Sequence, residues 1–168
     1  MPTHLAWLEK LVSHVEVPDG VAPVRGFDVR KYMGRWHEIA RLEHWFERGL
    51  SRCTAEYSLA ENGGVNVVNR GYDAAKNRWR EARGRAYFIG APDVGHLKVS
   101  FFGPFYGSYA ILDLDDDYSH SMVCGPDKSY LWILARNPET ESKTVERMLD
   151  RAKHLQFATD QLIRGGSK

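Results

Sequence analysis

The feature that most constrains this chain is a series of short segments in which apolar and polar residues alternate, each followed by turn residues. Turn residues stand at 62–64, 73–77, 91–93, 103–104, 115–117 and 125–127, so a new segment begins about every ten residues. Alternation with a period of two is typical of a strand that has one buried face. The pattern predicts eight strands, over residues 35–41, 52–60, 64–73, 78–90, 95–102, 107–114, 118–125 and 130–136.

A helix is expected at each end of this series. Apolar residues at helical spacing predict a short helix over residues 3–15 and a longer one after Pro138, with Thr140 as its N-cap. The apolar face of the second helix consists of Val145, Met148, Leu149, Ala152 and Leu155. We therefore divide the chain into an N-terminal helix and extended lead-in (1–25), a barrel with a C-terminal helix (26–160) and a tail (161–168).

Eight antiparallel strands joined by short connections close into a barrel, because closure removes the two unpaired edges. The predicted fold is all-β: an eight-stranded antiparallel up-and-down β-barrel, or calyx, with the C-terminal α-helix packed outside. A barrel of this size either holds one small ligand or is filled by its own side chains. Small residues expected at inward positions, namely Ala40, Ala55 and Val67, favour an open cavity.

Composition narrows the classes of partner. The chain has 168 residues, which is about one domain, and its 23 basic and 22 acidic side chains give a net charge of +1. So small a charge argues against nucleic acid and against docking driven by an anionic surface. Two cysteines, Cys53 and Cys124, are too few for a disulfide framework and are predicted to be free thiols.

The sequence as written also lacks the signals of membrane insertion and export. No apolar run reaches the roughly 18 to 20 residues of a membrane span, and residues 1–20 do not resemble a signal peptide. As written, the sequence therefore predicts a cytoplasmic protein.

The two ends of the strand series are expected to meet at one pole of the barrel. Strand direction alternates, so Trp36 at the start of the first strand, Arg136 at the end of the eighth and Asp115 in the turn after the sixth lie at the same end. A guanidinium over an indole face contributes about 0.5–2 kcal/mol and closes the floor. Gly34 leaves room for this contact.

These residues resemble the three conserved regions of the lipocalin family. The carriers of the resemblance are Gly34-x-Trp36 after Asp28-x-x-x-Tyr32, Asp115 and Arg136, and the match extends over residues 26–160. The stretches "GRWHEIARLEHWFERG" and "VCGPDKSYLWILAR" are most similar to the bacterial lipocalin and apolipoprotein D branch. The resemblance implies binding of fatty acids, lysophospholipids or similar amphiphiles without catalysis.

That branch is usually anchored to the bacterial outer membrane through an N-terminal cysteine. This sequence has no cysteine before Cys53, so anchoring is not implied. The family pattern places the protein in the periplasm or at the outer membrane if an export signal was removed.

Once Trp36 is placed inside, alternation predicts which side chains line the cavity and bind the ligand. Strand four is ambiguous, because a bulge there would reverse its two faces. Glu38 and Asn69 are expected to bind a head group or a trapped water, although Glu38 also fits a buried carboxylate satisfied by Tyr or Arg neighbours. The predicted lining is Glu38, Ala40, Cys53, Ala55, Tyr57, Val65, Val67, Asn69, Ala86, Phe88, Leu97, Val99, Phe101, Tyr130, Trp132 and Leu134.

The loops at the opposite pole carry a second group of aromatic residues. Those expected to rim the mouth are Trp45, Phe46, Phe102, Phe105 and Tyr106. Exposed aromatics at an opening are typical of a hydrophobic ligand site or of an interaction surface. In the alternative interpretation, Phe46 and Phe105 fold down as lids. The sequence leaves open whether the protein is a monomer or a homodimer and whether it makes peripheral contact with a membrane.

No metal, cofactor or catalytic site is predicted. His37-Glu38 begins like a zinc-protease motif, but the residue four positions after His37 is Arg41. Asp113, Asp115 and Asp117 have calcium-loop spacing, but the glycine and the final glutamate of such a loop are missing, so a solvated turn is expected.

Three functional hypotheses follow. The leading one is a non-enzymatic carrier of a small hydrophobic ligand. The second is an enzyme that uses Cys53, whose position is similar to that of the nucleophile in lipocalin-type prostaglandin synthases, although Arg52 is expected to point outward. The third is an interaction module, in which the aromatic mouth loops mediate dimerisation or membrane docking.

Overall fold

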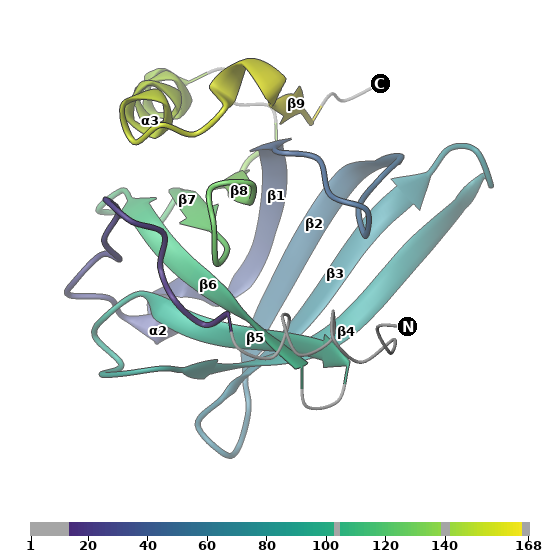
Figure 1. Ribbon diagram of the computed structural model, residues 1–168. Helices are drawn as coiled ribbons and strands as arrows, with labels where there is room; N and C mark the ends of the chain where they lie inside the picture. Colours follow the sequence, from purple (N-terminus) through teal and green to yellow (C-terminus); the bar gives the residue numbers. More distant parts are fainter. Residues whose placement is uncertain (1–13, 103–104, 139–141, 166–168) are drawn as a thin grey trace, which may run out of the picture.

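The computed structural model, which describes residues 14–102, 105–138 and 142–165, is a closed eight-stranded antiparallel barrel (Figure 1). Each strand pairs with the next, and β1 also pairs with β8, which closes the barrel. The predicted fold class is therefore confirmed. The strands are β1 Gly34–Arg41, β2 Leu50–Leu59, β3 Val65–Asp73, β4 Arg78–Phe88, β5 His96–Phe102, β6 Phe105–Leu114, β7 His120–Cys124 and β8 Leu131–Ala135.

The elements outside the barrel differ more from the predictions. Helix α3 (Lys143–His154) is present, but its N-cap is Ser142, whose Oγ accepts a hydrogen bond from the backbone N–H of Val145 at 3.1 Å. The predicted cap, Thr140, lies outside the described residues. The same holds for the predicted helix over residues 3–15, except for its last two positions.

Three short elements were not predicted. Helix α2 (Val29–Tyr32) precedes β1, and the 3₁₀ turn η1 (Thr159–Gln161) leads into β9 (Ile163–Arg164). Strand β9 pairs with β1, so the segment predicted as a tail contributes to the sheet.

The apolar residues form two separate cores, one inside the barrel and one between its outer wall and α3. The predicted apolar face of α3 is confirmed, because Val145, Met148, Leu149 and Ala152 are all buried in the outer core. Every residue of β7 is buried because one face of the strand meets the barrel interior and the other meets the outer core. The barrel wall that faces the outer core contributes Ile39, Ala40, Ala110, Leu112, Met122, Cys124, Leu131, Ile133 and Ala135.

A β-bulge in β1 overturns one prediction about the cavity. Glu38 pairs with Leu134, but Ala40 pairs with Ile133, so the register shifts by one residue at Ile39. Because side chains alternate with a period of two, one extra residue moves all later side chains to the opposite face. Ala40 consequently lies in the outer core under α3 and not in the cavity, while Arg41 points into the barrel.

The floor of the barrel has the predicted arrangement. The Arg136 guanidinium carbon lies 3.9 Å from the centroid of the Trp36 ring, and Trp36 is fully buried. Arg136 also donates hydrogen bonds to the backbone carbonyls of Arg35, Lys31 and Tyr118 at 3.0, 3.0 and 3.2 Å. Gly34 has a φ of +95°, and a Cβ at this position would lie 3.3 Å from Arg136 Nη1. The prediction that Gly34 leaves room for Arg136 agrees with this distance, and the positive φ is a second, unpredicted reason for glycine here.

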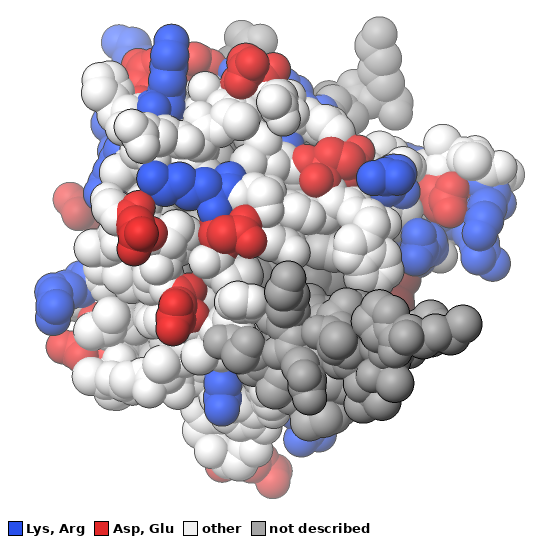
Figure 2. All heavy atoms as spheres, in the orientation of Figure 1, with Lys and Arg blue, Asp and Glu red and all other residues white. Residues whose placement is uncertain are grey.

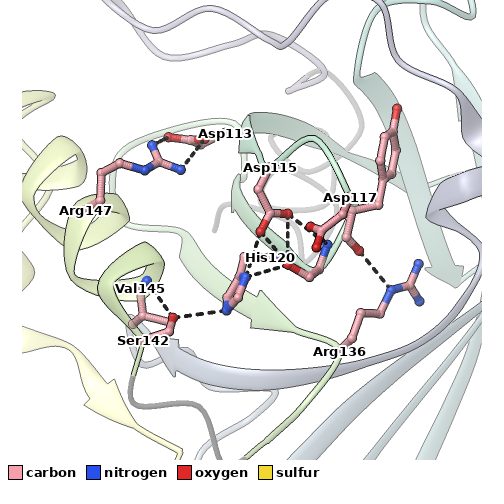
Figure 3. A network of polar contacts seen from close by, with 10 residues as sticks. Asp113, Asp115, Asp117, His120, Arg136, Ser142, Val145 and Arg147 are labelled. Atoms are coloured by element: carbon pink, nitrogen blue, oxygen red, sulfur yellow. Dashed lines mark hydrogen bonds and ion pairs between the residues drawn. The ribbon is translucent and has the colours of Figure 1, made fainter.

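Asp115 organises the turn that follows β6 (Figure 3). Its Oδ1 accepts hydrogen bonds from the backbone N–H groups of Ser119 and His120, both at 2.8 Å, and its Oδ2 lies 2.8 Å from His120 Nδ1. Burial alone would raise the pKa of Asp115, but these hydrogen bonds outweigh it and hold the pKa below its usual range.

The same network continues from His120 to α3. Ser142 Oγ lies 3.2 Å from His120 Nε2, so an acid, a histidine and a serine stand in line (Figure 3). Because the Ser142 hydroxyl also caps α3, we assign this line a structural role, in which it ties the floor to the helix.

The sequence predicted that the neighbouring Asp113 lies in a solvated turn, but this prediction is wrong. Its carboxylate is buried and accepts hydrogen bonds from Arg147 at 2.8 Å and from Arg151 at 3.0 Å, both on α3. Asp113 and Asp115 thus serve different partners, and their side chains do not converge on a cation site.

Candidate functional site: the barrel interior

Most of the predicted lining residues lie on the inner face of the barrel. On β4 the register is regular, with Val65 opposite Ala86 and Val67 opposite Gly84, which resolves the ambiguity in favour of inward Ala86 and Phe88. Tyr130 also differs from its predicted place in the cavity wall. Its ring stacks on His44 at the mouth, with ring centroids 3.8 Å apart. The interior cluster includes Ala55, Tyr57, Val65, Val67, Ala86, Phe88, Leu97, Val99, Phe101, Trp132 and Leu134.

Burial differs between the two halves of the interior. Near the floor, Trp36, Leu97, Ile111, Val123 and Leu134 are buried and pack against one another. Other inward-facing residues stay partly accessible although they are inside the barrel: Ala55, which pairs with Trp36, and Asn69, Val99, Phe101 and Trp132.

Gly107 shows the open space directly. It lies opposite the inward residue Val99, and a Cβ built at Gly107 meets no atom within 4 Å. The inward-facing side chains are therefore closely packed at the floor, while the interior near Gly107 has room for additional atoms.

A buried ion-pair cluster lies beneath the mouth and is centred on Arg41, which is 4% exposed. Its Nη1 donates to Glu38 Oε1 at 2.9 Å and lies 3.7 Å from Cys53 Sγ. Its Nη2 donates to the backbone carbonyls of Glu47 and Leu50, both at 3.0 Å. The guanidinium thus holds the loop between β1 and β2 against the barrel wall. Glu38 is the buried, arginine-satisfied carboxylate of the alternative interpretation.

Glu47 reaches from this loop into the barrel and completes the cluster. It accepts a hydrogen bond from Trp132 Nε1 at 2.8 Å. Burial raises the pKa of Glu38 well above its usual range, and the adjacent Glu47 raises it further. The carboxyl oxygens of Glu38 and Glu47 lie within 4.8 Å of each other, and this proximity favours the protonated form of Glu38.

The cluster also contains three potential metal-ligand atoms, on Glu38, Glu47 and Cys53, which lie within 4.8 Å of one another. Arg41 already contacts two of them, and its charge occupies the place that a cation would take. Burial raises the pKa of the Cys53 thiol, and the two glutamates add to this effect. A thiol that keeps its proton is a poor nucleophile. The cluster therefore functions as an ion-pair clamp on the mouth loop.

Both cysteines are free and buried, as predicted.

The mouth carries exposed aromatic side chains. Trp45 is 68% exposed and Phe46 is 39% exposed. The alternative in which Phe46 and Phe105 pack on each other as lids stays a prediction. Tyr106 does not rim the mouth as predicted, because it lies on the outer face of β6 with Lys98 Nζ 4.7 Å from its ring centroid. The backbones of Phe102 and Phe105 pair at the β5–β6 turn, and their side chains lie outside the described set.

The comparisons with known proteins agree with this geometry. A profile of the lipocalin-like domain matches residues 27–166. The chain belongs to the lipocalin family. This lipocalin is 48% identical over 158 residues to the outer membrane lipoprotein Blc of Citrobacter freundii, a match that covers 94% of this chain and 89% of the relative.

More distant lipocalins extend the match. Temperature-induced lipocalin-1 of Arabidopsis thaliana is 35% identical over 138 residues, covering 77% of this chain and 73% of the relative. Apolipoprotein D of Mus musculus is 33% identical over 132 residues, covering 74% and 68%. Insecticyanin from the tobacco hornworm Manduca sexta has the same fold, with a TM-score of 0.72 and 23% identity over 91% of this chain and 87% of that one. The predicted bacterial lipocalin and apolipoprotein D branch is thus confirmed.

The sequence analysis missed three polar residues of this lipocalin's interior. Arg41 was missed because the bulge that turns it inward leaves no mark in the alternation. Glu47 was missed because it reaches the cavity from a loop. Tyr109 was overlooked for a different reason, since it occupies the inward position opposite Leu97 and alternation along β6 would have found it.

Charge and hydropathy add two further observations. On the face shown in Figure 2, acidic and basic side chains are interspersed over the barrel, while basic side chains gather at the hairpin of β3 and β4. Within the described part of the chain, no helix has the length and apolar character needed to cross a bilayer.

Proposed function

We propose that this lipocalin carries a single-chain amphiphile, such as a fatty acid or a lysophospholipid, in the hollow half of its barrel and catalyses no reaction. The single observation that carries the proposal is the inward-facing, partly accessible apolar wall above a packed floor, with open space at Gly107. The protonated Cys53 thiol supports binding without catalysis. The names of the bacterial relatives support a place in the bacterial envelope, which fractionation of producing cells would test.

Hydrocarbon burial alone suffices for useful affinity. Burying about 12 methylenes at about 0.8 kcal/mol each contributes roughly 10 kcal/mol. Immobilising the ligand and the mouth loop costs a few kcal/mol, which leaves micromolar to submicromolar affinity.

Native mass spectrometry of the purified protein tests the proposal, combined with displacement of the apolar dye N-phenyl-1-naphthylamine. We expect an adduct of a few hundred daltons, and dye that a fatty acid displaces. The variant Gly107→Trp fills the open space and abolishes both signals. The variant Gly90→Trp is a matched control, since a Cβ at this exposed turn also meets no atom within 4 Å, and it keeps both signals. A wild-type protein that carries no adduct and binds no dye refutes the carrier function.

A second candidate function is docking of the mouth end onto an anionic bilayer. The exposed ring of Trp79 at the β3–β4 hairpin lies between Arg52 and Arg70, whose guanidinium carbons are 5.1 and 5.4 Å from the ring centroid. Further exposed cations on this hairpin are Lys76, Arg78, Arg80, Arg83 and Arg85. A net charge of +1 therefore conceals an uneven distribution.

Co-sedimentation with phosphatidylglycerol vesicles at low salt tests the docking hypothesis. We expect the wild type to sediment and the double variant Arg78→Glu/Arg80→Glu to stay in solution. Phosphatidylcholine vesicles are the control surface, and equal sedimentation with both lipids contradicts a charge-driven contact.

A further inference from the structure

Four hydroxyl groups form a chain just above the floor of the barrel. Tyr32 Oη lies 3.0 Å from Ser121 Oγ and 2.8 Å from Tyr109 Oη, and Tyr109 Oη lies 2.9 Å from Tyr57 Oη. The order of the chain is thus Ser121, Tyr32, Tyr109, Tyr57. Burial raises the pKa of all three phenols, that of Tyr32 to about 12, so each hydroxyl keeps its proton at neutral pH.

The four hydroxyl groups carry four hydrogens but make only three contacts with one another. Each hydroxyl has one hydrogen to donate, and three contacts use three of the four hydrogens. None of these four side chains has a further hydrogen-bond partner among the described residues. One O–H is therefore left to donate, and a buried donor without an acceptor costs free energy. An acceptor atom on a ligand satisfies it, whereas a ligand that only donates does not.

Tyr109 is the member of the chain that a ligand reaches. Tyr32, Tyr57 and Ser121 are buried, while Tyr109 is partly accessible. Tyr109 follows the open inward position Gly107 by two residues on β6, which runs toward the floor, so its ring lies between Gly107 and the floor. When Tyr32 and Tyr57 both donate to Tyr109, its own hydrogen is free to donate upward, and the donors behind it strengthen that bond.

Charge selects the kind of acceptor. Arg136 lies under the chain, since it covers the Trp36 ring against which Tyr32 packs with centroids 4.8 Å apart. A cation on this side favours an acceptor that carries negative charge. At the mouth, in contrast, Arg41 directs its donors to Glu38, Glu43, Cys53 and two backbone carbonyls. The mouth also presents the exposed aromatics Trp45 and Phe46, which suit the apolar end of a ligand.

We propose that this lipocalin binds a single-chain carboxylic acid with its carboxyl group inward, where the Tyr109 hydroxyl donates to a carboxyl oxygen, and with its hydrocarbon end toward the mouth. The inference rests on the proposed carrier function and deepens it by naming the head group and the orientation of the ligand.

The first test separates the head-group contact from the hydrocarbon contact. We expect Tyr109→Phe to weaken dodecanoic acid about tenfold, which corresponds to about 1.4 kcal/mol, and to leave binding of N-phenyl-1-naphthylamine within about twofold. Tyr57→Phe keeps the Tyr109 donor and one surplus hydrogen, so it changes dodecanoic acid binding less than about threefold. Tyr87→Phe removes a hydroxyl from the outer face of the barrel and is the matched control. An unchanged affinity of folded Tyr109→Phe for the acid, or equal losses for both probes, overturns the inference.

The second test uses the wild-type protein and so does not depend on the folding of a variant. In crystals grown with 12-bromododecanoic acid, we expect the anomalous signal of bromine at the mouth, near Trp132. A signal beside Tyr109 reverses the orientation and overturns this inference while leaving the carrier function intact. Failure of the wild type to bind either probe overturns the carrier function itself, and this inference with it.

Discussion

The bulge in β1 makes a quantitative prediction, because it gives different surroundings to two alanines that alternation alone places on the same inner face. Ala40 is fully buried in the outer core under α3, whereas Ala55 is partly accessible inside the barrel. The variants Ala40→Leu and Ala55→Leu add the same atoms at the two positions. Their effects on stability and on binding should therefore be opposite.

For Ala40→Leu, the added atoms enter a closely packed site between β1, β8 and α3. Overpacking of this kind costs about 1–3 kcal/mol. A chain of this size loses roughly 2–4 °C in Tm per kcal/mol, so we expect Tm to fall by about 2–12 °C. Affinity of the folded variant for dodecanoic acid should stay within about twofold of the wild type.

For Ala55→Leu, the added atoms enter the partly accessible interior beside Trp36 and should displace two or three methylenes of the ligand. At about 0.8 kcal/mol each, the loss corresponds to roughly 10- to 50-fold weaker binding, with Tm nearly unchanged. Differential scanning calorimetry and titration calorimetry on both variants measure the four quantities. A stable Ala40→Leu that binds poorly would refute the bulge and restore simple alternation from Trp36.

Three further predictions concern the floor and the ion-pair cluster. Arg136→Met removes a cation–π contact and three hydrogen bonds, so the free energy of unfolding in urea should fall by about 2–4 kcal/mol; a loss below about 0.5 kcal/mol contradicts the role of Arg136 as the floor clamp. Because the pKa of Glu38 is raised in the folded state, its contribution to stability is complete below its unfolded value of 4.5 and is lost as pH rises through the folded pKa. The wild type should therefore lose more stability than Glu38→Gln between about pH 5 and pH 8, and parallel pH profiles would disprove this coupling. Iodoacetamide should label the Cys53 thiol more slowly than free cysteine, whereas labelling at an equal or higher rate would revive the catalytic alternative.

The sequence was sufficient for every feature that depends on local pattern. Alternation and turn residues located all eight strands with each boundary within two residues of the observed one. Counting strand directions placed Trp36, Asp115 and Arg136 at one pole, and the structure confirms their contacts. Helical periodicity identified the buried face of α3.

The errors have different origins. A bulge adds one residue to a strand without changing the alternation that the sequence shows. Alternation therefore placed Ala40 inside the barrel and Arg41 outside it, the reverse of the observed arrangement. The N-cap is Ser142, whose hydroxyl accepts a hydrogen bond from the Val145 N–H three residues later, so this cap is a local feature that the prediction of Thr140 missed. Tyr106 was assigned to the mouth because its loop was, although its side chain belongs to the outer face.

Local pattern in the sequence thus determined that the chain forms a calyx and which pole is closed, because strand period, turn chemistry and strand direction are properties of neighbouring residues. The polar interior was decided only in the tertiary structure. The Arg41 clamp and the hydroxyl chain through Tyr109 each join side chains from strands and loops that are distant in sequence. Their hydrogen-bond balance exists only once the barrel has closed and removed these groups from water.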